Sequence, residues 1–95
     1  MREVRIERAL RKSVERMGGL ALKFVSPGLD GVPDRIVLLP GGRMAFVEVK
    51  APGKNVRPLQ ARRREQLEGL GFRVYVVDGI EQIDTILDGM GGDAR

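Results

Sequence analysis

The chain has 95 residues, 42% of them hydrophobic and 32% charged, which is typical of one small globular domain. It contains no cysteine and no histidine, which excludes disulfides, zinc–thiolate sites and catalysis by imidazole. The missing cysteines suit a reducing cytoplasm, where we expect the protein to act, and no apolar stretch is long enough to span a membrane. Since 17 basic and 13 acidic residues give a net charge of only +4, the distribution of the basic residues is more informative than their excess.

The first half of the chain predicts a helix followed by three strands. Ile6, Leu10 and Val14 form an apolar stripe in a helix over residues 3–17, most of whose remaining surface is basic, and Gly18-Gly19 ends it. Residues 20–25 read as a strand, with Lys23 on one face, and residues 26–31 as a loop. Residues 35–39 and 44–50 are rich in β-branched and apolar side chains, and the Pro-Gly-Gly-Arg segment between them predicts a hairpin.

The second half predicts a helix, a strand and a short final helix. The second helix covers residues 58–69, with Leu59, Arg63, Leu67 and Leu70 toward its inner side. A strand follows over residues 72–77, and Asp78 is expected to cap the last helix. The order is therefore α-β-β-β-α-β-α, and a right-handed crossover should place the last strand parallel to the strand that ends at residue 50. We expect an α/β domain over residues 1–88 with a mixed sheet flanked by helices, and a flexible glycine-rich tail over residues 89–95.

Three ionisable groups are predicted to meet at one edge of the sheet. Asp34 begins one hairpin strand, while Glu48 and Lys50 end its partner and point to the same face. Such a cluster is costly unless a cation or a substrate uses it. The alternative is structural: Asp34 would cap a turn, and Glu48 and Lys50 would form an ion pair.

Four segments carry a resemblance to a known family. They are Gly-Val-Pro-Asp-Arg-Ile-Val-Leu-Leu, Pro-Gly-Gly-Arg, Phe-Val-Glu-Val-Lys-Ala-Pro-Gly and Arg-Pro-Leu-Gln, and with them residues 3–78 resemble the VRR-NUC branch of the PD-(D/E)xK nucleases. The resemblance implies a core of the restriction-endonuclease type and divalent-metal-dependent hydrolysis of phosphodiesters. It also implies a preference for branched or flapped DNA, such as Holliday junctions, and a homodimer like those of small phage members.

Without histidine, phosphodiester hydrolysis near neutral pH needs a metal ion to generate hydroxide and to neutralise the phosphate. Oxygen ligands favour Mg²⁺ or Mn²⁺, and we expect Asp34 and Glu48 to bind it together with the main-chain carbonyl of Val49. Lys50 would then orient or deprotonate the attacking water, or stabilise the pentavalent phosphate; the sequence leaves both roles open.

Other site residues are less certain from the sequence. Gln60 resembles a family glutamine that reaches into the site, but it could equally be an exposed helix residue. Related resolvase-type nucleases use a glutamate of the first helix to hold metal, for which Glu7 is the first choice and Glu3 the competitor; either could instead pair with an arginine. Lys23 could point toward the site or protect an edge strand from aggregation.

Five basic residues follow the Glu-Val-Lys segment and are predicted to contact phosphates: Lys54, Arg57, Arg62, Arg63 and Arg64. The aromatic side chains all fall in predicted strands, so we expect them in the core and expect little base stacking. Two other functions remain open at this point: a binding module of the same fold that does not cut, and a ribonuclease.

Overall fold

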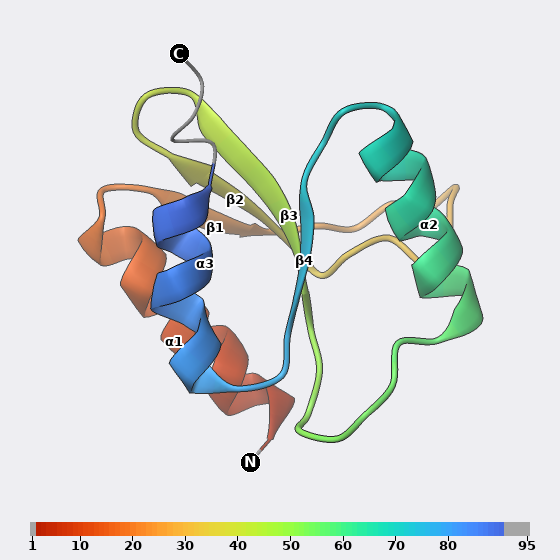
Figure 1. The fold of residues 1–95 in the computed structure, drawn as a ribbon, viewed down its shortest axis with the longest axis horizontal. Helices are drawn as coiled ribbons and strands as arrows, with labels where there is room; N and C mark the ends of the chain where they lie inside the picture. Colours follow the sequence, from red (N-terminus) through yellow and green to blue (C-terminus); the bar gives the residue numbers. More distant parts are fainter. Residues whose placement is uncertain (1, 91–95) are drawn as a thin grey trace.

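The computed structural model describes residues 2–90, and it confirms the predicted order of helices and strands (Figure 1). The elements are α1 (Glu3–Arg16), β1 (Leu20–Lys23), β2 (Arg35–Leu39), β3 (Arg43–Val49), α2 (Pro58–Gly69), β4 (Val74–Val77), the 3₁₀ turn η1 (Ile80–Gln82) and α3 (Ile83–Gly89). In the described residues the predicted final helix is therefore a 3₁₀ turn that continues into a short α-helix.

The strands form one mixed sheet in the order β1-β2-β3-β4. β2 pairs antiparallel with β1 and β3, and Gly41 and Gly42, at φ +87° and +76°, make the hairpin turn that only glycine adopts easily. β3 and β4 are parallel, with Glu48 opposite Val76, because α2 supplies the crossover between them. The predicted mixed sheet and its parallel strand pair are confirmed.

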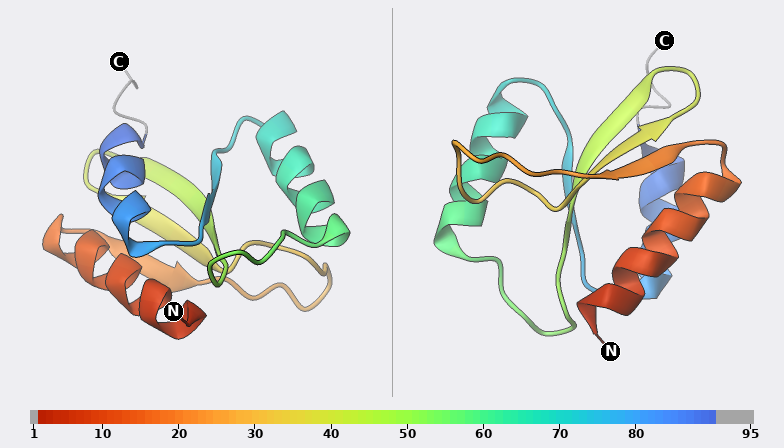
Figure 2. Two further views of the ribbon diagram at one scale, coloured as in Figure 1. Left: turned by 60° about the horizontal axis from the view of Figure 1, so that its bottom comes forward. Right: turned by 180° about the vertical axis from the view of Figure 1, so that it is seen from behind.

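α1 and α3 cover one face of this sheet, and the main core lies there (Figures 1 and 2). The predicted stripe of α1 is fully buried, and it packs with Val37, Val47, Val77, Ile83 and Leu87 in one continuous cluster. These side chains alternate along each strand with others that point toward α2, as the pleat of a sheet requires.

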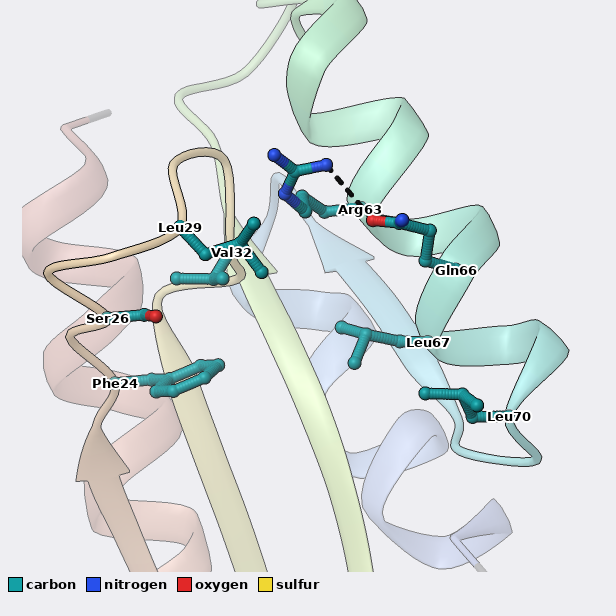
Figure 3. A pocket seen from close by; sticks show the side chains of 8 residues that line it. All are labelled: Phe24, Ser26, Leu29, Val32, Arg63, Gln66, Leu67 and Leu70. Carbon is teal, nitrogen blue, oxygen red and sulfur yellow. Dashed lines mark hydrogen bonds between the residues drawn. The ribbon is translucent and has the colours of Figure 1, made fainter.

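α2 stands on the opposite face and covers it incompletely (Figure 1). Gln60 is its one buried residue, and the apolar contacts of this layer centre on Phe46, whose ring centroid lies 5.6 Å from that of Phe24 and 5.9 Å from that of Phe72. A cavity of about 250 Å³ remains between α2 and the segment before β2 (Figure 3), lined by Phe24, Ser26, Leu29, Val32, Arg63, Gln66, Leu67 and Leu70.

Several boundaries and faces differ from the sequence prediction. β1 ends at Lys23, so Phe24 and Val25 lie outside the strand, and β4 begins at Val74, so Phe72 precedes it and is 45% exposed. Leu59 and Leu70, expected on the inner side of α2, are exposed, because the buried position of this helix is Gln60. The buried Gln60 rather than an apolar stripe fixes how α2 faces the sheet.

The end of the chain also needs correction. Gly79, rather than the predicted Asp78, is the N-cap of η1, and Asp78 instead exchanges two hydrogen bonds with Gln82. The tail was expected to begin at Gly89, yet Gly89 belongs to α3 and Met90 is fully buried in the main core. Packing thus extends at least to Met90, and residues 91–95 of the predicted tail lie outside the described residues.

Candidate active site

The candidate site lies where β2 begins and β3 ends. Asp34 directly precedes β2, and its Oδ2 accepts a 2.8 Å hydrogen bond from the main-chain N–H of Val49. Glu48 is 4% exposed, and Lys50, just after β3, places its Nζ 3.5 Å from Glu48 Oε2. The hairpin register thus brings the three predicted side chains together at one end of the sheet.

Gln60 joins α2 to this cluster. Its Nε2 donates a short hydrogen bond to Glu48 Oε2, and its Oε1 accepts one of 3.1 Å from the main-chain N–H of Arg57 at the start of α2. Because both ends of the amide are used, its orientation is fixed, and the interpretation of Gln60 as an exposed helix residue is wrong. Through these two hydrogen bonds, Gln60 holds the Glu48 carboxylate and anchors the first turn of α2.

Both carboxyl groups are harder to ionise than in water. The pKa of Glu48 is raised from its ordinary value of 4.5 to about 7, chiefly by burial and also by the neighbouring charge of Asp34, against the attraction of Lys50. Burial likewise raises the pKa of Asp34, assisted by the charges of Glu7 and Glu3 and opposed by the N–H of Val49. Burial is therefore the main reason why both carboxyl groups hold their protons more tightly than in water, and the neighbouring carboxylates add to it.

The free carboxylate oxygens fit a hard divalent cation. One oxygen of each carboxylate is committed to the protein, whereas Asp34 Oδ1 and Glu48 Oε1 form no hydrogen bond with any residue in the described range. Mg²⁺ is often held by one or two carboxylates and keeps several waters. Residues 2–90 contain no group of three acidic side chains arranged around one point, so such an ion would rely on water or main-chain oxygen for its remaining ligands.

The glutamates of α1 approach the site without joining it. Both influence the ionisation of Asp34, but Glu7 Oε2 lies 3.2 Å from Arg35 Nε, and Arg35 also donates a 3.0 Å hydrogen bond to the carbonyl of Ala21. Glu7 thus forms the arginine pair that was its alternative. Sequence reasoning missed Arg35, although an arginine that shares a strand face with buried Val37 needs a polar partner.

The basic residues predicted to bind phosphate differ in their surroundings. Arg64 pairs with Glu68 at 3.2 Å, and Arg63 turns toward the segment before β2, where its Nε is buried without a partner (Figure 3). Lys54, Arg57 and Arg62 remain exposed. Lys23 is exposed on the edge strand β1 and makes no ion pair with any described residue.

A hollow of about 410 Å³ opens beside Gln60, between the start of α2 and the loop before β2. Arg57 and Asp30 lie on its walls, and Gly31 forms part of its lining. Gly31 has φ +85°, and a Cβ there would come within 2.8 Å of the Leu59 side chain. Glycine therefore allows this loop to lie against α2 and to shape the hollow next to the carboxylates.

Asp34, Glu48, Lys50 and Gln60, the residues of the PD-(D/E)xK pattern that the sequence resembles, thus lie together at one end of the sheet. A model of the VRR-NUC domain matches residues 3–81, and the chain belongs to this family. It is 48% identical over 87 residues to a protein of Acyrthosiphon pisum secondary endosymbiont phage 1 named "Putative nuclease p44", with 92% of each chain covered. A solved structure described as a VRR_NUC domain has a TM-score of 0.85 at 34% identity, covering 92% of this chain and 95% of the other.

These similarities identify the chain as a nuclease domain and confirm the predicted family and fold class. Among the helices within residues 2–90, none is both long enough and apolar enough to cross a membrane.

Proposed function

We propose that the protein is a divalent-metal-dependent endonuclease that hydrolyses DNA phosphodiester bonds at the Asp34–Glu48–Lys50 cluster. The observation that carries the proposal is the pair of carboxylates, Glu48 buried and Asp34 partly buried, each with one free oxygen, beside a lysine and a fixed amide. Burial is the main cause of their raised pKa values, and a bound cation would stabilise the ionised forms of both carboxyl groups. Mg²⁺ or Mn²⁺ would activate water for attack and neutralise charge on the phosphate.

The protein groups have distinct tasks in this proposal. Asp34 and Glu48 hold the cation, assisted by the carbonyl of Val49, and Gln60 keeps the Glu48 carboxylate in place. The ammonium of Lys50, 3.5 Å from Glu48 Oε2, would act on the attacking water or on the phosphate. Arg57 borders the adjacent hollow, where it would bind a phosphate next to the scissile one.

The test is cleavage of labelled four-way junction, flap, single-stranded and duplex DNA with Mg²⁺ or Mn²⁺. We expect cutting that EDTA stops and that Lys50→Ala abolishes, and we expect the branched substrates to be cut best. A set of RNA strands of the same sequences separates deoxyribonuclease from ribonuclease activity. Binding without cutting, under either metal, would replace the nuclease proposal with a binding module.

We also propose that the protein is a homodimer, formed through apolar side chains on the incompletely covered face. Leu20 and Leu22 of β1 are 56% and 43% exposed, and Leu70 and Phe72 after α2 are 73% and 45% exposed. The pairing of Leu22 with Ile36 and of Ile36 with Phe46 places β1 and the Phe46 cluster on the same side of the sheet. Apolar patches of this kind commonly mark protein interfaces.

Sedimentation equilibrium tests the dimer. Leu22→Asp should shift the protein to the monomer, whereas Val25→Asp, which alters a residue that is 71% exposed outside β1, should leave the dimer intact. A wild-type protein that is monomeric at high concentration, with and without DNA, would refute the dimer and leave the cleavage proposal standing.

A further inference from the structure

A second basic surface lies on α1, on the sheet face opposite to α2. Arg5, Arg8 and Lys12 border a hollow of about 230 Å³ whose floor includes Ala9 and Ile80. The three cations are spaced three and four residues apart, so they follow one side of the helix. We call this set the α1 basic ridge. It is separate from the basic residues that follow Lys50 in the chain.

The α1 basic ridge is not neutralised by the protein. All three side chains are exposed, and within residues 2–90 none of them forms an ion pair or a side-chain hydrogen bond, whereas the nearby Arg11 and Arg35 pair with glutamates. Like charges at these helical spacings destabilise a helix. An anionic ligand would remove this repulsion, so the ridge has the charge pattern of a binding surface for a polyanion.

The ridge also lies at the catalytic end of the sheet. Arg8 borders a second hollow of about 180 Å³ together with Glu7 and Arg35, and the charge of Glu7 acts on Asp34. β4 also connects the two regions. The main-chain N–H of Lys50 donates a hydrogen bond to the carbonyl of Val77, and Ile80, which lines the hollow beside the α1 basic ridge, lies three residues after Val77. The carboxylate cluster therefore has cations on both flanks: Arg57 on the α2 side and the α1 basic ridge on the α1 side.

We propose that the α1 basic ridge binds the sugar-phosphate backbone of the nucleic-acid substrate, so that the substrate spans the catalytic edge from the α2 side to the α1 side. The inference rests on the proposed nuclease function and adds the second contact surface. Exposed arginines and a lysine in an open hollow fit phosphates without reading bases, so the ridge contributes affinity and orientation rather than sequence preference.

The test is equilibrium binding of a labelled duplex and of a labelled four-way junction in EDTA, where no cutting occurs, over a series of KCl concentrations. The plot of log K against log [salt] has a negative slope, and each lost phosphate contact should reduce the steepness of that slope by about 0.9. This change corresponds to roughly eightfold weaker binding at about 0.1 M salt. We expect this loss for Arg8→Ala, recovery for Arg8→Lys, and a larger loss for Arg5→Ala/Arg8→Ala/Lys12→Ala. Arg16→Ala is the matched control, since it removes the same charge from the far end of α1.

The outcomes separate this inference from the nuclease proposal. Equal effects of Arg8→Ala and Arg16→Ala, or no effect of either, would overturn the ridge as a binding surface even if the wild-type protein cuts DNA. Wild-type protein that binds through the ridge but never cuts would support the inference and refute the nuclease. Wild-type protein that binds neither DNA in EDTA would overturn the ridge, and the cleavage assay with Mg²⁺ or Mn²⁺ would decide the nuclease proposal separately.

Discussion

Neutralising Glu48 should stabilise the folded protein while removing its activity. The pKa of Glu48 is raised from 4.5 to about 7 in the folded state, so folding makes its proton harder to remove. The ionised carboxylate consequently destabilises the fold, by about 3 kcal/mol at a pH well above 7, and this cost vanishes below the unfolded pKa. Glu48→Gln keeps the shape and an acceptor for Gln60 but is never ionised, and so it avoids the cost.

The sign of the pH dependence follows from the same pKa values. Below about pH 4.5 both the folded and the unfolded states bind the proton, and the variant gains nothing from losing the charge. As the pH rises toward 7, the Glu48 carboxyl group loses its proton readily in the unfolded state but not in the folded state. Ionisation therefore favours the unfolded state, and the wild-type protein loses stability relative to Glu48→Gln. Between about pH 5 and pH 8 the stability difference between the two proteins should grow by about 2.5 kcal/mol.

Urea denaturation at these two pH values, followed by circular dichroism, measures this difference. Glu65→Gln removes the same charge from an exposed position of α2 and controls for net charge. Saturating Mg²⁺ at the higher pH should stabilise the wild-type protein and leave Glu48→Gln almost unaffected, because a ligand stabilises only the state that binds it. If Glu48→Gln is less stable than the wild-type protein at both pH values, the carboxylate is adequately neutralised by Lys50 and our reasoning on the cation is wrong.

Three further predictions test other parts of the structure. Lys50→Ala should abolish cleavage. Lys50→Arg keeps the charge but is not a base at neutral pH, so it should retain measurable single-turnover cleavage if Lys50 acts by stabilising the phosphate. If Lys50→Arg has no activity, the result favours the role of Lys50 as a base. Gly31→Ala should lower the free energy of unfolding, measured by urea denaturation, by about 2 kcal/mol or more, because the alanine would combine φ +85° with a clash against Leu59. Gly28→Ala, whose Cβ would have no atom within 4 Å, should lower it little. Equal effects of the two substitutions would contradict the close packing of this loop. Met90→Ala should destabilise the protein by about 2–5 kcal/mol because Met90 is fully buried, whereas Val25→Ala, at a 71% exposed position, should have a small effect; an unchanged urea midpoint for Met90→Ala would mean that the chain packs only to residue 88.

The local pattern of the sequence was sufficient for the strands and helices that carry the site. The hairpin around Gly41-Gly42 follows from turn chemistry and from two runs of β-branched residues, and its register alone brings Asp34 next to Glu48. The apolar stripe of α1 likewise predicted its buried face. These features depend on interactions between residues that are close in sequence or paired by one turn, which is why they could be read before the fold was known.

Features that depend on distant contacts were predicted less well. α2 has no apolar stripe, and its orientation depends on the hydrogen bond from Gln60 to Glu48, twelve residues earlier in the chain. The partner of Glu7 is Arg35, twenty-eight residues away, and neither spacing nor composition specifies that pair. The burial of Met90 depends on α3 packing against α1, which a glycine-rich C-terminal segment did not suggest.

The sequence by itself determined the order of the elements, the family and the three ionisable residues of the site, because motif spacing and periodicity are local properties. Only the tertiary structure decided how those residues are used. Burial is the main cause of the raised pKa of Glu48, the pairing with Arg35 holds Glu7, and the position of α1 beside the candidate site places Arg8 in the same hollow as Glu7 and Arg35. Desolvation and Coulomb interactions depend on distances through space, and the folded chain alone fixes those distances.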